Sequence, residues 1–359
     1  MCSSAHRHSL HCILPPYILS RMAENGSPDI REKAMRTLLV DPTIRIIRAS
    51  TAGPVTGTIA RRRAAAGNIL TPSPLRTIRD AGNAPEAPGA IIARREGDPP
   101  TGDVAVNEAY DGLGATFDLF WEAYQRNSID HAGLPLDATV HYDQDYDNAF
   151  WDGTQMVFGD GDGELFNRFT ISLDIIAHEL THGVTEKEAG LAYYSQSGAL
   201  NESISDVFGS QVKQRMLGQS ADEADWLIGA GLFTAAVNGA ALRSMVAPGT
   251  AYDDPVLGRD PQPGHMDDYV RTNEDNGGVH INSGIPNRAF QLAAVTIGGF
   301  AWDKAGRIWY NALLDPNTRA NTDFAGFARI TIQVAERLYG PDSAEATAVA
   351  DGWRTVGVI

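Results

Sequence analysis

The chain has 359 residues, a formal net charge of −16 and 43% hydrophobic residues, which indicates an ordinary globular protein of about two domains. This acidic balance argues against a nucleic acid or an anionic membrane as partner, because binding phosphate requires a basic surface. No run of 18 apolar residues is present, so we expect no membrane-spanning helix.

The charge is unevenly divided. Residues 1–63 carry ten Lys and Arg against four Asp and Glu, a net charge of +6, which leaves −22 for the rest of the chain. Cys2 and Cys12 are the only cysteines and lie in the basic part, so a metal in the acidic part must be bound by His and carboxylates. The first twelve residues contain three His and one Arg, which is not typical of a secretory signal peptide.

The pattern predicts a helix over 28–40, ended by Asp41-Pro42, and then an exposed linker that leads to strands near Ile78 and Ile91. Residues 138–169 are typical of strands and turns. Apolar periodicity predicts further helices over 104–126, 171–188, 198–216, 280–299, 301–314 and 322–340. The body is therefore mixed in its first half and mainly helical afterwards.

The central motif is His178-Glu179-Leu180-Thr181-His182, inside the predicted helix 171–188. Residues four apart share one helix face, so both imidazoles can bind one metal ion. Glu179 can hold a water on that metal and act as a general base. The same HExxH pattern also occurs by chance, so residues elsewhere in the chain must support the interpretation as a metal site.

Carboxylates on the helical faces support the metal interpretation. Glu202 is a candidate third ligand, because a catalytic zinc site needs three protein ligands and one open position. Asp206 lies four residues after Glu202 and can accept the free N–H of a ligating histidine. Asp174, four residues before His178, is a second candidate for that supporting role. The alternative is that both aspartates are solvated helix-face carboxylates.

A third cluster spans residues 275–284. Its paired glycines give a tight turn that can present His280 to a cleft, with Asp275 orienting the ring. The alternative is a structural turn in which His280 only makes hydrogen bonds and has no role in a site. The chain has Thr185 and Glu188 where an HExxHxxGxxH metalloprotease needs Gly and His, and it lacks an exopeptidase motif, so an endopeptidase is favoured over an aminopeptidase.

These blocks together resemble the thermolysin family of zinc endopeptidases. The similarity runs from about Arg76 to the C-terminus. The blocks that carry it are 148–151, 159–163, 178–182, 198–206, 241–245 and 276–280. Pro15, Pro16 and Tyr17 resemble the short propeptide of the protealysin-like subgroup.

The resemblance implies an α+β, two-domain thermolysin-like fold with the zinc helix at the floor of a cleft. Residues 1–63 would be a basic propeptide and linker, 64–170 a β-rich subdomain and 171–359 an α-helical subdomain. The implied function is a zinc-dependent neutral endopeptidase, made as a zymogen, that acts on protein or peptide substrates. The propeptide would be an intramolecular inhibitor, and the protein is expected to be a monomer.

The resemblance also implies roles for individual residues. Zinc would be bound by His178, His182 and Glu202. Catalysis would use Glu179 on the water, Tyr193 and His280 on the oxyanion, and Asp275 as partner of His280. Substrate backbone would be bound by Asn148, Ala149 and Arg243. The leaving-side pocket would be lined by Phe166, Phe169, Ile175 and Leu242, whose apolar character predicts cleavage before bulky hydrophobic residues.

The chain departs from the family at the paired calcium site near the zinc helix. Asp174 and Asp225 are retained, but Lys213, Leu227 and Ala230 stand where carboxylates would be needed. A lysine removes a ligand and adds a repelling charge, so we predict that Lys213 pairs with one of these aspartates and that the paired calcium site is absent. Calcium binding elsewhere in the chain is left open. The GDGDGE sequence at 159–164 is read as an ordinary turn.

The basic head has two interpretations, a flexible tail or an inhibitory segment that docks on the acidic body. In the second, apolar residues provide specificity, and they are Ile13, Leu14, Tyr17, Ile18 and Leu19. Cys2 or Cys12 as a cap on the open zinc position is a further alternative. The family resemblance favours secretion, with a cytoplasmic zymogen as the alternative, and a non-catalytic binding protein is the competing functional class.

Overall fold

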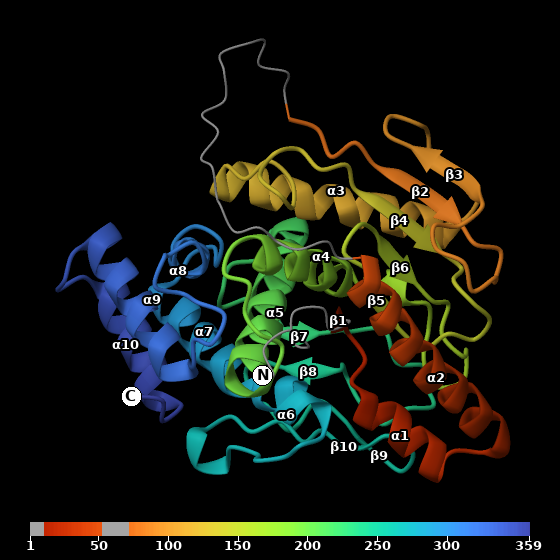
Figure 1. Cartoon of the computed structure of the whole chain (residues 1–359). Coiled ribbons are helices and arrows are strands. Elements are labelled where there is room, and N and C mark those ends of the chain that lie inside the picture. Colours follow the sequence, from red (N-terminus) through yellow and green to blue (C-terminus); the bar gives the residue numbers. More distant parts are fainter. Residues whose placement is uncertain (1–10, 52–71) are drawn as a thin grey trace.

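A six-stranded sheet forms one side of the computed structural model, which describes residues 11–51 and 72–359 (Figure 1). The spatial order is β1-β5-β6-β4-β2-β3. The bounds are β1 His11–Cys12, β2 Thr77–Asp80, β3 Ile91–Arg95, β4 Asp137–Val140, β5 Ala149–Trp151 and β6 Met156–Phe158. The pairs β2–β4 and β4–β6 are parallel, and the other neighbours are antiparallel. The N-terminal segment therefore supplies one edge strand of the body's own sheet.

Helix α3 (Val104–Tyr124) lies beside this sheet, within the predicted range 104–126 (Figure 1). Its N-cap is Asp103, whose carboxylate accepts a hydrogen bond from Val106 N at 3.2 Å. Its inner face is almost continuously apolar and buried. This burial explains why the apolar periodicity of the segment predicts the helix correctly.

Helices α4 (Leu173–Lys187) and α5 (Ser195–Leu217) pack against each other in the middle of the molecule (Figure 1). The two backbones come very close at Gly209, where an added Cβ would lie 2.5 Å from Asp174 O. Glycine is required for this approach, because any side chain would force the helices apart. The close packing brings the polar residues of both helices into the interior.

The rest of the body is mainly helical, as predicted. The helices are α6 Asp275–Asn282, α7 Gly284–Ile297, α8 Ala305–Leu313, α9 Phe324–Tyr339 and α10 Ala344–Thr355. The single helix expected over 280–299 is divided into α6 and α7, and α10 was not predicted. Short elements complete this part, namely β7 Leu227–Ile228, β8 Arg243–Ser244, β9 Asp253–Asp254, β10 Gly258–Arg259, and the 3-10 turns Phe169–Ile171 and Met266–Asp268.

The N-terminal segment folds into α1 (Pro16–Asn25) and α2 (Pro28–Thr51), which pack together. The expectation that Asp41-Pro42 ends the second helix is wrong, because the helix continues to Thr51. A proline removes one intrahelical hydrogen bond, and a long helix can continue across that loss. The predicted linker with its three arginines, and Cys2, lie outside the described residues.

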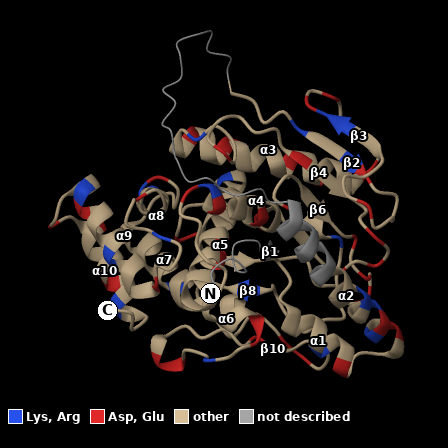
Figure 2. Ribbon diagram, viewed as in Figure 1, with Lys and Arg blue, Asp and Glu red and all other residues tan. Residues whose placement is uncertain are grey.

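Asp and Glu residues are distributed over many segments of the body, while α2 contains both basic and acidic residues (Figure 2). Lys33 of α2 pairs with Glu164 of the body at 3.2 Å. Within residues 11–51 and 72–359, no helix has the length and apolar character needed to cross a membrane.

Candidate active site

The two histidines of the HExxH motif converge on one point. His178 Nε2 and His182 Nε2 lie 3.0 Å apart, because α4 places residues four positions apart on one face. Glu202 of α5 faces them, with Oε2 3.4 Å from His178 Nε2 and Oε1 3.5 Å from His182 Nε2. All three side chains are fully buried. The ligand atoms predicted from sequence are therefore brought together by two helices.

The outer ring nitrogens of both histidines have fixed partners. His178 Nδ1 lies 2.8 Å from Asp206 Oδ1, and His182 Nδ1 lies 2.9 Å from Asn201 Oδ1 and 3.1 Å from Ser205 Oγ. Such contacts hold the proton on Nδ1, so that Nε2 carries the lone pair that can bind a metal. Asp206 was expected in this position, whereas Asn201 and Ser205 were missed although they flank Glu202 in sequence.

Asp206 is itself held by buried groups. Arg243 donates to both of its carboxylate oxygens, at 2.9 and 2.8 Å, and Asn287 Nδ2 donates to Oδ2 at 2.8 Å. Burial by itself raises the pKa of Asp206, but the charges of Arg243 and His178 lower it to about 2. The carboxylate is therefore charged and holds the His178 ring firmly. Asn287 was not predicted, because it comes from α7, far along the chain.

Glu179 has one anchored and one free carboxylate oxygen. Its Oε2 accepts a hydrogen bond from Trp151 N at 3.2 Å, and its Oε1 is buried without a hydrogen-bond partner among the described residues. Burial raises the pKa of Glu179 well above its ordinary value. A carboxylate with a raised pKa and a free oxygen in a cleft can accept and return a proton. The contact to Trp151 was not foreseen, because it depends on the sheet edge.

His280 is oriented by Asp275, as expected. His280 Nδ1 lies 2.6 Å from Asp275 Oδ1, and its backbone N–H donates to Asp275 Oδ2 at 2.8 Å. Between the two residues, Gly277 and Gly278 have φ values of +81° and +76°, the left-handed conformation that favours glycine. Burial tends to lower the pKa of His280, but the charge of Asp275 raises it overall. The ring is thereby suited to donate a hydrogen bond.

Tyr193 completes the cluster. Its hydroxyl donates to Glu202 Oε1 and lies 3.1 Å from His280 Nε2. Burial and the charge of Glu202 raise the pKa of this hydroxyl, so it is a proton donor at neutral pH. Tyr193 and His280 therefore present two donors on the same side of the histidine pair.

Asp174 lies elsewhere than expected. It does not contact His178; its carboxylate pairs with Lys213 Nζ at 2.9 Å and accepts from Gly229 N at 3.1 Å. The side chain of a helical residue points toward the helix N-terminus, which directs Asp174 away from a residue one turn later. Lys213 also pairs with Asp225 at 2.9 Å. The predicted lysine–aspartate pairing is confirmed, with both aspartates involved.

The N-terminal segment contacts the catalytic residues through strand β1 and the bend at Ile13 and Leu14 that follows it. His11 and Cys12 pair with β5, and Ile13 N donates to Ala149 O at 3.3 Å. Leu14 N donates to Asn148 Oδ1 at 3.1 Å. Arg243 Nη1 donates to Ile13 O at 3.4 Å, and His280 Nε2 lies 3.0 Å from Cys12 O. The residues expected to bind substrate backbone thus hold this chain's own backbone.

Apolar contacts accompany this pairing. Ile13, Leu14, Ile18 and Leu19 are all at most 1% exposed. The expected pocket residues belong to the same hydrophobic cluster and are Phe166, Phe169, Ile175 and Leu242. Pro15 and Pro16 are the N-cap and first residue of α1, and Tyr17 packs against the cluster. Cys12 is buried and packs in a separate cluster with Tyr142, Tyr146, Phe150 and Val157.

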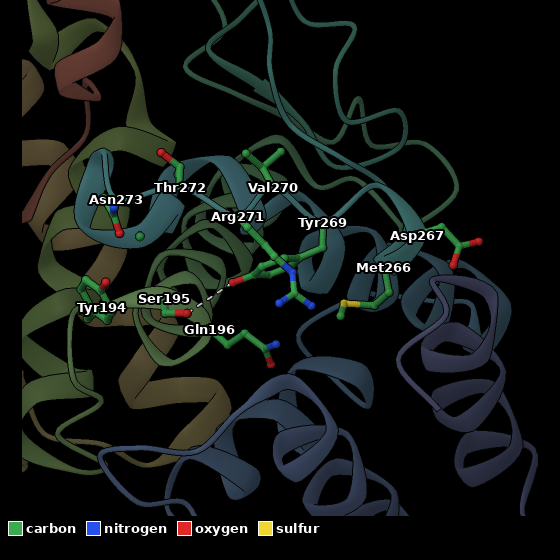
Figure 3. Close-up of a pocket in the computed structure, with 11 residues that line it drawn as sticks. Tyr194, Ser195, Gln196, Met266, Asp267, Tyr269, Val270, Arg271, Thr272 and Asn273 are labelled. Carbon is green, nitrogen blue, oxygen red and sulfur yellow. Dashed lines mark hydrogen bonds between the residues drawn. The ribbon is translucent and has the colours of Figure 1, made fainter.

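A pocket of about 620 Å³ lies beyond Tyr193, between the start of α5 and residues 266–277 (Figure 3). Ser195 Oγ and Tyr269 OH meet across it at 3.3 Å. None of the predicted site residues lines this pocket. The catalytic cluster is covered by the N-terminal segment, which explains why the open hollow lies beside the cluster.

Two family models match the chain. The catalytic domain of thermolysin metallopeptidase matches residues 87–186, and its alpha-helical domain matches residues 189–358. The chain belongs to the thermolysin family of zinc metalloendopeptidases. It is similar to an extracellular metalloprotease of Pectobacterium carotovorum subsp. carotovorum, with 55% identity over 96% of both chains. It is also similar to protease PrtS of Photorhabdus sp. (strain Az29), with 47% identity over 96% of this chain and 91% of PrtS.

A solved structure agrees with this assignment. The precursor of protealysin, a metalloproteinase from Serratia proteamaculans, aligns with a TM-score of 0.86 and 53% identity. The alignment covers 97% of this chain and 100% of that one. The expected thermolysin-like fold and the protealysin-like subgroup are thereby confirmed.

The donor set fits the zinc on which thermolysin-family enzymes depend. His178, Glu179 and His182 have ligand atoms within 4.8 Å of one another. Oε2 of Glu202 is buried and has no hydrogen-bond partner among the described residues, which leaves an oxygen available to a cation. Imidazole and carboxylate groups are the usual ligands of catalytic zinc.

Proposed function

We propose that this thermolysin-family enzyme is made as a zymogen and cuts peptide bonds that precede bulky hydrophobic residues. The observation that carries the proposal is the position of Ile13. Its N–H and C=O bind Ala149 and Arg243, and its side chain is fully buried. A segment of the chain's own N-terminus thus occupies the cleft in the manner expected of a substrate.

His178, His182 and Glu202 would hold the zinc, and Glu179 would serve as the general base. Bound zinc supplies Lewis acidity that activates water and the scissile carbonyl. Glu179 takes the proton of the attacking water on its free Oε1 and delivers it to the leaving nitrogen. Tyr193 and His280 donate hydrogen bonds to the carbonyl oxygen as it gains negative charge. Asn148, Ala149 and Arg243 align the substrate backbone.

Internally quenched peptides test the activity and the preference. The processed protein is expected to cleave a peptide with Leu or Phe after the scissile bond at least about 10-fold faster than one with Gly, because an apolar pocket gains about 1–3 kcal/mol from a large apolar group. A zinc chelator should abolish cleavage. Release of N-terminal residues only would instead indicate an aminopeptidase, and equal rates for Gly and Leu would contradict the preference.

Inhibition by the N-terminal segment needs its own test. Leu14 is fully buried in the cleft and donates its N–H to Asn148. The unprocessed Leu14→Asp variant should cleave the quenched peptide faster than the unprocessed wild type, because a buried charge weakens docking. Met35→Asp is the matched control, because Met35 is exposed on α2. Equal basal activity of Leu14→Asp and wild type would contradict autoinhibition.

We also propose that the enzyme is a monomer, is secreted, and lacks the paired calcium site. The two aspartates expected at that site are bound to the ammonium of Lys213. Because the lysine occupies both aspartates, millimolar calcium should leave the melting temperature of the protein unchanged.

The secretion proposal is supported by the similarity to an extracellular metalloprotease. Gel filtration and fractionation of the producing culture test the other two statements.

A further inference from the structure

The N-terminal segment runs through the cleft with a definite polarity. Its carbonyl at Cys12 lies 3.0 Å from His280 Nε2, and its next N–H, on Ile13, donates to Ala149 O. The following carbonyl, on Ile13, faces Arg243 Nη1, and the N–H of Leu14 faces Asn148. Every polar backbone atom from Cys12 O to Leu14 N therefore has a partner on the enzyme.

This alternation fixes which peptide bond lies at the reacting position. The carbonyl that is attacked must lie beside the groups that stabilise the oxyanion. Cys12 O occupies that place, because His280 Nε2 also lies 3.1 Å from the Tyr193 hydroxyl. Ile13 O, one residue later, is bound by Arg243 instead. The bond between Cys12 and Ile13 is thus the one presented to the catalytic cluster.

Glu179 is connected to the N-terminal segment through strand β5. Its Oε2 is held by Trp151 N, and Trp151 pairs with His11, the residue before Cys12. Its Oε1 is buried without a hydrogen-bond partner among the described residues, so it can accept a proton from water. The Glu179 carboxylate is therefore hydrogen-bonded to β5, the strand that pairs with the N-terminal segment.

We propose that the enzyme slowly hydrolyses its own Cys12–Ile13 bond. This proposal rests on the proposed peptidase function. A water oxygen bonds to the Cys12 carbonyl carbon, and the bond from that carbon to Ile13 N breaks. The two hydrogens of the water end on the new Cys12 carboxyl group and the new Ile13 amine, the latter by way of Glu179. Hydrolysis is slow because the site is buried, and water enters only when the segment shifts.

The cut has an unusual chemical signature. It removes residues 1–12, which contain both cysteines of the chain, while Ile13 remains joined to the body. Ile13, Leu14, Ile18 and Leu19 remain buried in the cleft region. The product is therefore a chain shortened by twelve residues that has no thiol, and it differs in mass from the product of any cut in the predicted linker.

The test follows the purified zinc-loaded full-length chain over days by intact mass and by maleimide labelling under denaturing conditions. A species that begins at Ile13 and lacks any label should accumulate. Its first-order rate constant should not change over a tenfold range of protein concentration. Glu179→Gln should slow its appearance at least about 100-fold, which is the typical contribution of a general base.

Two variants separate bond position from simple destabilisation. Ile13→Pro removes the N–H that donates to Ala149, and it should reduce the cut at least about 10-fold. Cys12→Ser keeps the carbonyl at His280 and should cut within about twofold of wild type, because the thiol has no part in hydrolysis. A product that starts at Ile13 and forms in the Glu179→Gln protein as fast as in wild type, or a rate constant that rises in proportion to protein concentration, would overturn the proposal.

Failure of this proposal differs from failure of the proposed function. A protein that cleaves a quenched peptide or its own linker, yet leaves Cys12–Ile13 intact, contradicts the self-cleavage alone. A processed protein that cleaves no peptide contradicts the peptidase function, and the self-cleavage with it.

Discussion

At the scale of residues, the site depends on a chain of buried charges that starts at Arg243. This guanidinium holds Asp206, Asp206 holds the His178 ring, and Arg243 also reaches the carbonyl of Ile13. Each group is buried, so each charge requires its neighbour. One arginine therefore both orients a metal-binding ring and holds the backbone in the cleft.

Glu179→Gln should lower kcat/KM on a quenched peptide by at least about 1,000-fold, at the upper part of the range for a general base. The amide keeps an oxygen for Trp151 N but cannot take a proton from water. The processed variant, measured beside processed wild type, should unfold at the same urea concentration. Residual activity above about 1% of wild type would show that another group is the base.

His141 is expected to give a pH-dependent stability. Its imidazole lies 2.8 Å from both Asp103 and Asp160, and the hydrogen bond to Asp160, with that to Asp103, raises its pKa to about 9. A raised folded-state pKa stabilises the fold fully below the unfolded value of about 6.5, and the stabilisation is lost as pH rises through 9. His141→Gln should cost about 1–2 kcal/mol at pH 6, after discounting for solvent screening, and little at pH 10.

Urea unfolding at the two pH values measures this difference. His131→Gln is the control, because His131 is exposed and has no carboxylate partner among the described residues. An equal loss of stability at pH 6 and pH 10 would contradict the role of the imidazolium.

At the scale of elements, the sequence predicts what periodicity and spacing encode. The motif helix α4 and the partner helix α5 were expected, because apolar repeats and ligand spacing agree there. Helix α1 and the continuation of α2 past Pro42 were not expected. Helix α1 buries Ile18, Leu19 and Met22, and such packing outweighs weak local signals. The contacts of Trp151 and Asn287 to the site depend on sheet register and helix crossing, which no local pattern contains.

The junction between α4 and α5 yields an element-scale prediction. Lys213 on α5 is 13% exposed and pairs with Asp174 on α4, which is 1% exposed. Lys213→Met should lower the free energy of unfolding by about 3–5 kcal/mol, because it leaves a buried carboxylate without its partner. Adding Asp174→Asn should recover part of the loss.

The control for this variant is Lys304→Met, which removes an ammonium that is 48% exposed from its pair with Glu345. That change should cost about 0–1 kcal/mol. Equal decreases in the free energy of unfolding for the two variants would show that burial does not strengthen the contribution of the α4–α5 ion pair.

At the scale of the whole molecule, the uneven charge distinguishes two parts of the chain but does not explain how the basic N-terminal part binds to the acidic body. The basic head does contact the acidic body, but the described ion pair between them is Lys33 with Glu164. The larger contribution comes from apolar side chains that the body buries, such as Ile13, Leu14 and Met22. The charge distribution therefore indicates two parts of the chain, whereas apolar packing and strand pairing determine how the N-terminal segment contacts the body.

The burial of His178, His182 and Glu202 beneath the N-terminal segment has a consequence for the order of maturation. With the segment docked, metal can enter or leave only during transient opening, so zinc should bind faster before the segment docks. Stopped-flow uptake of zinc by the metal-free full-length chain should be at least about 10-fold slower than uptake by the processed enzyme. Equal rates would mean that the segment is not a barrier. Slower uptake by the full-length chain would mean that the same segment controls both when zinc binds and when substrate enters the site.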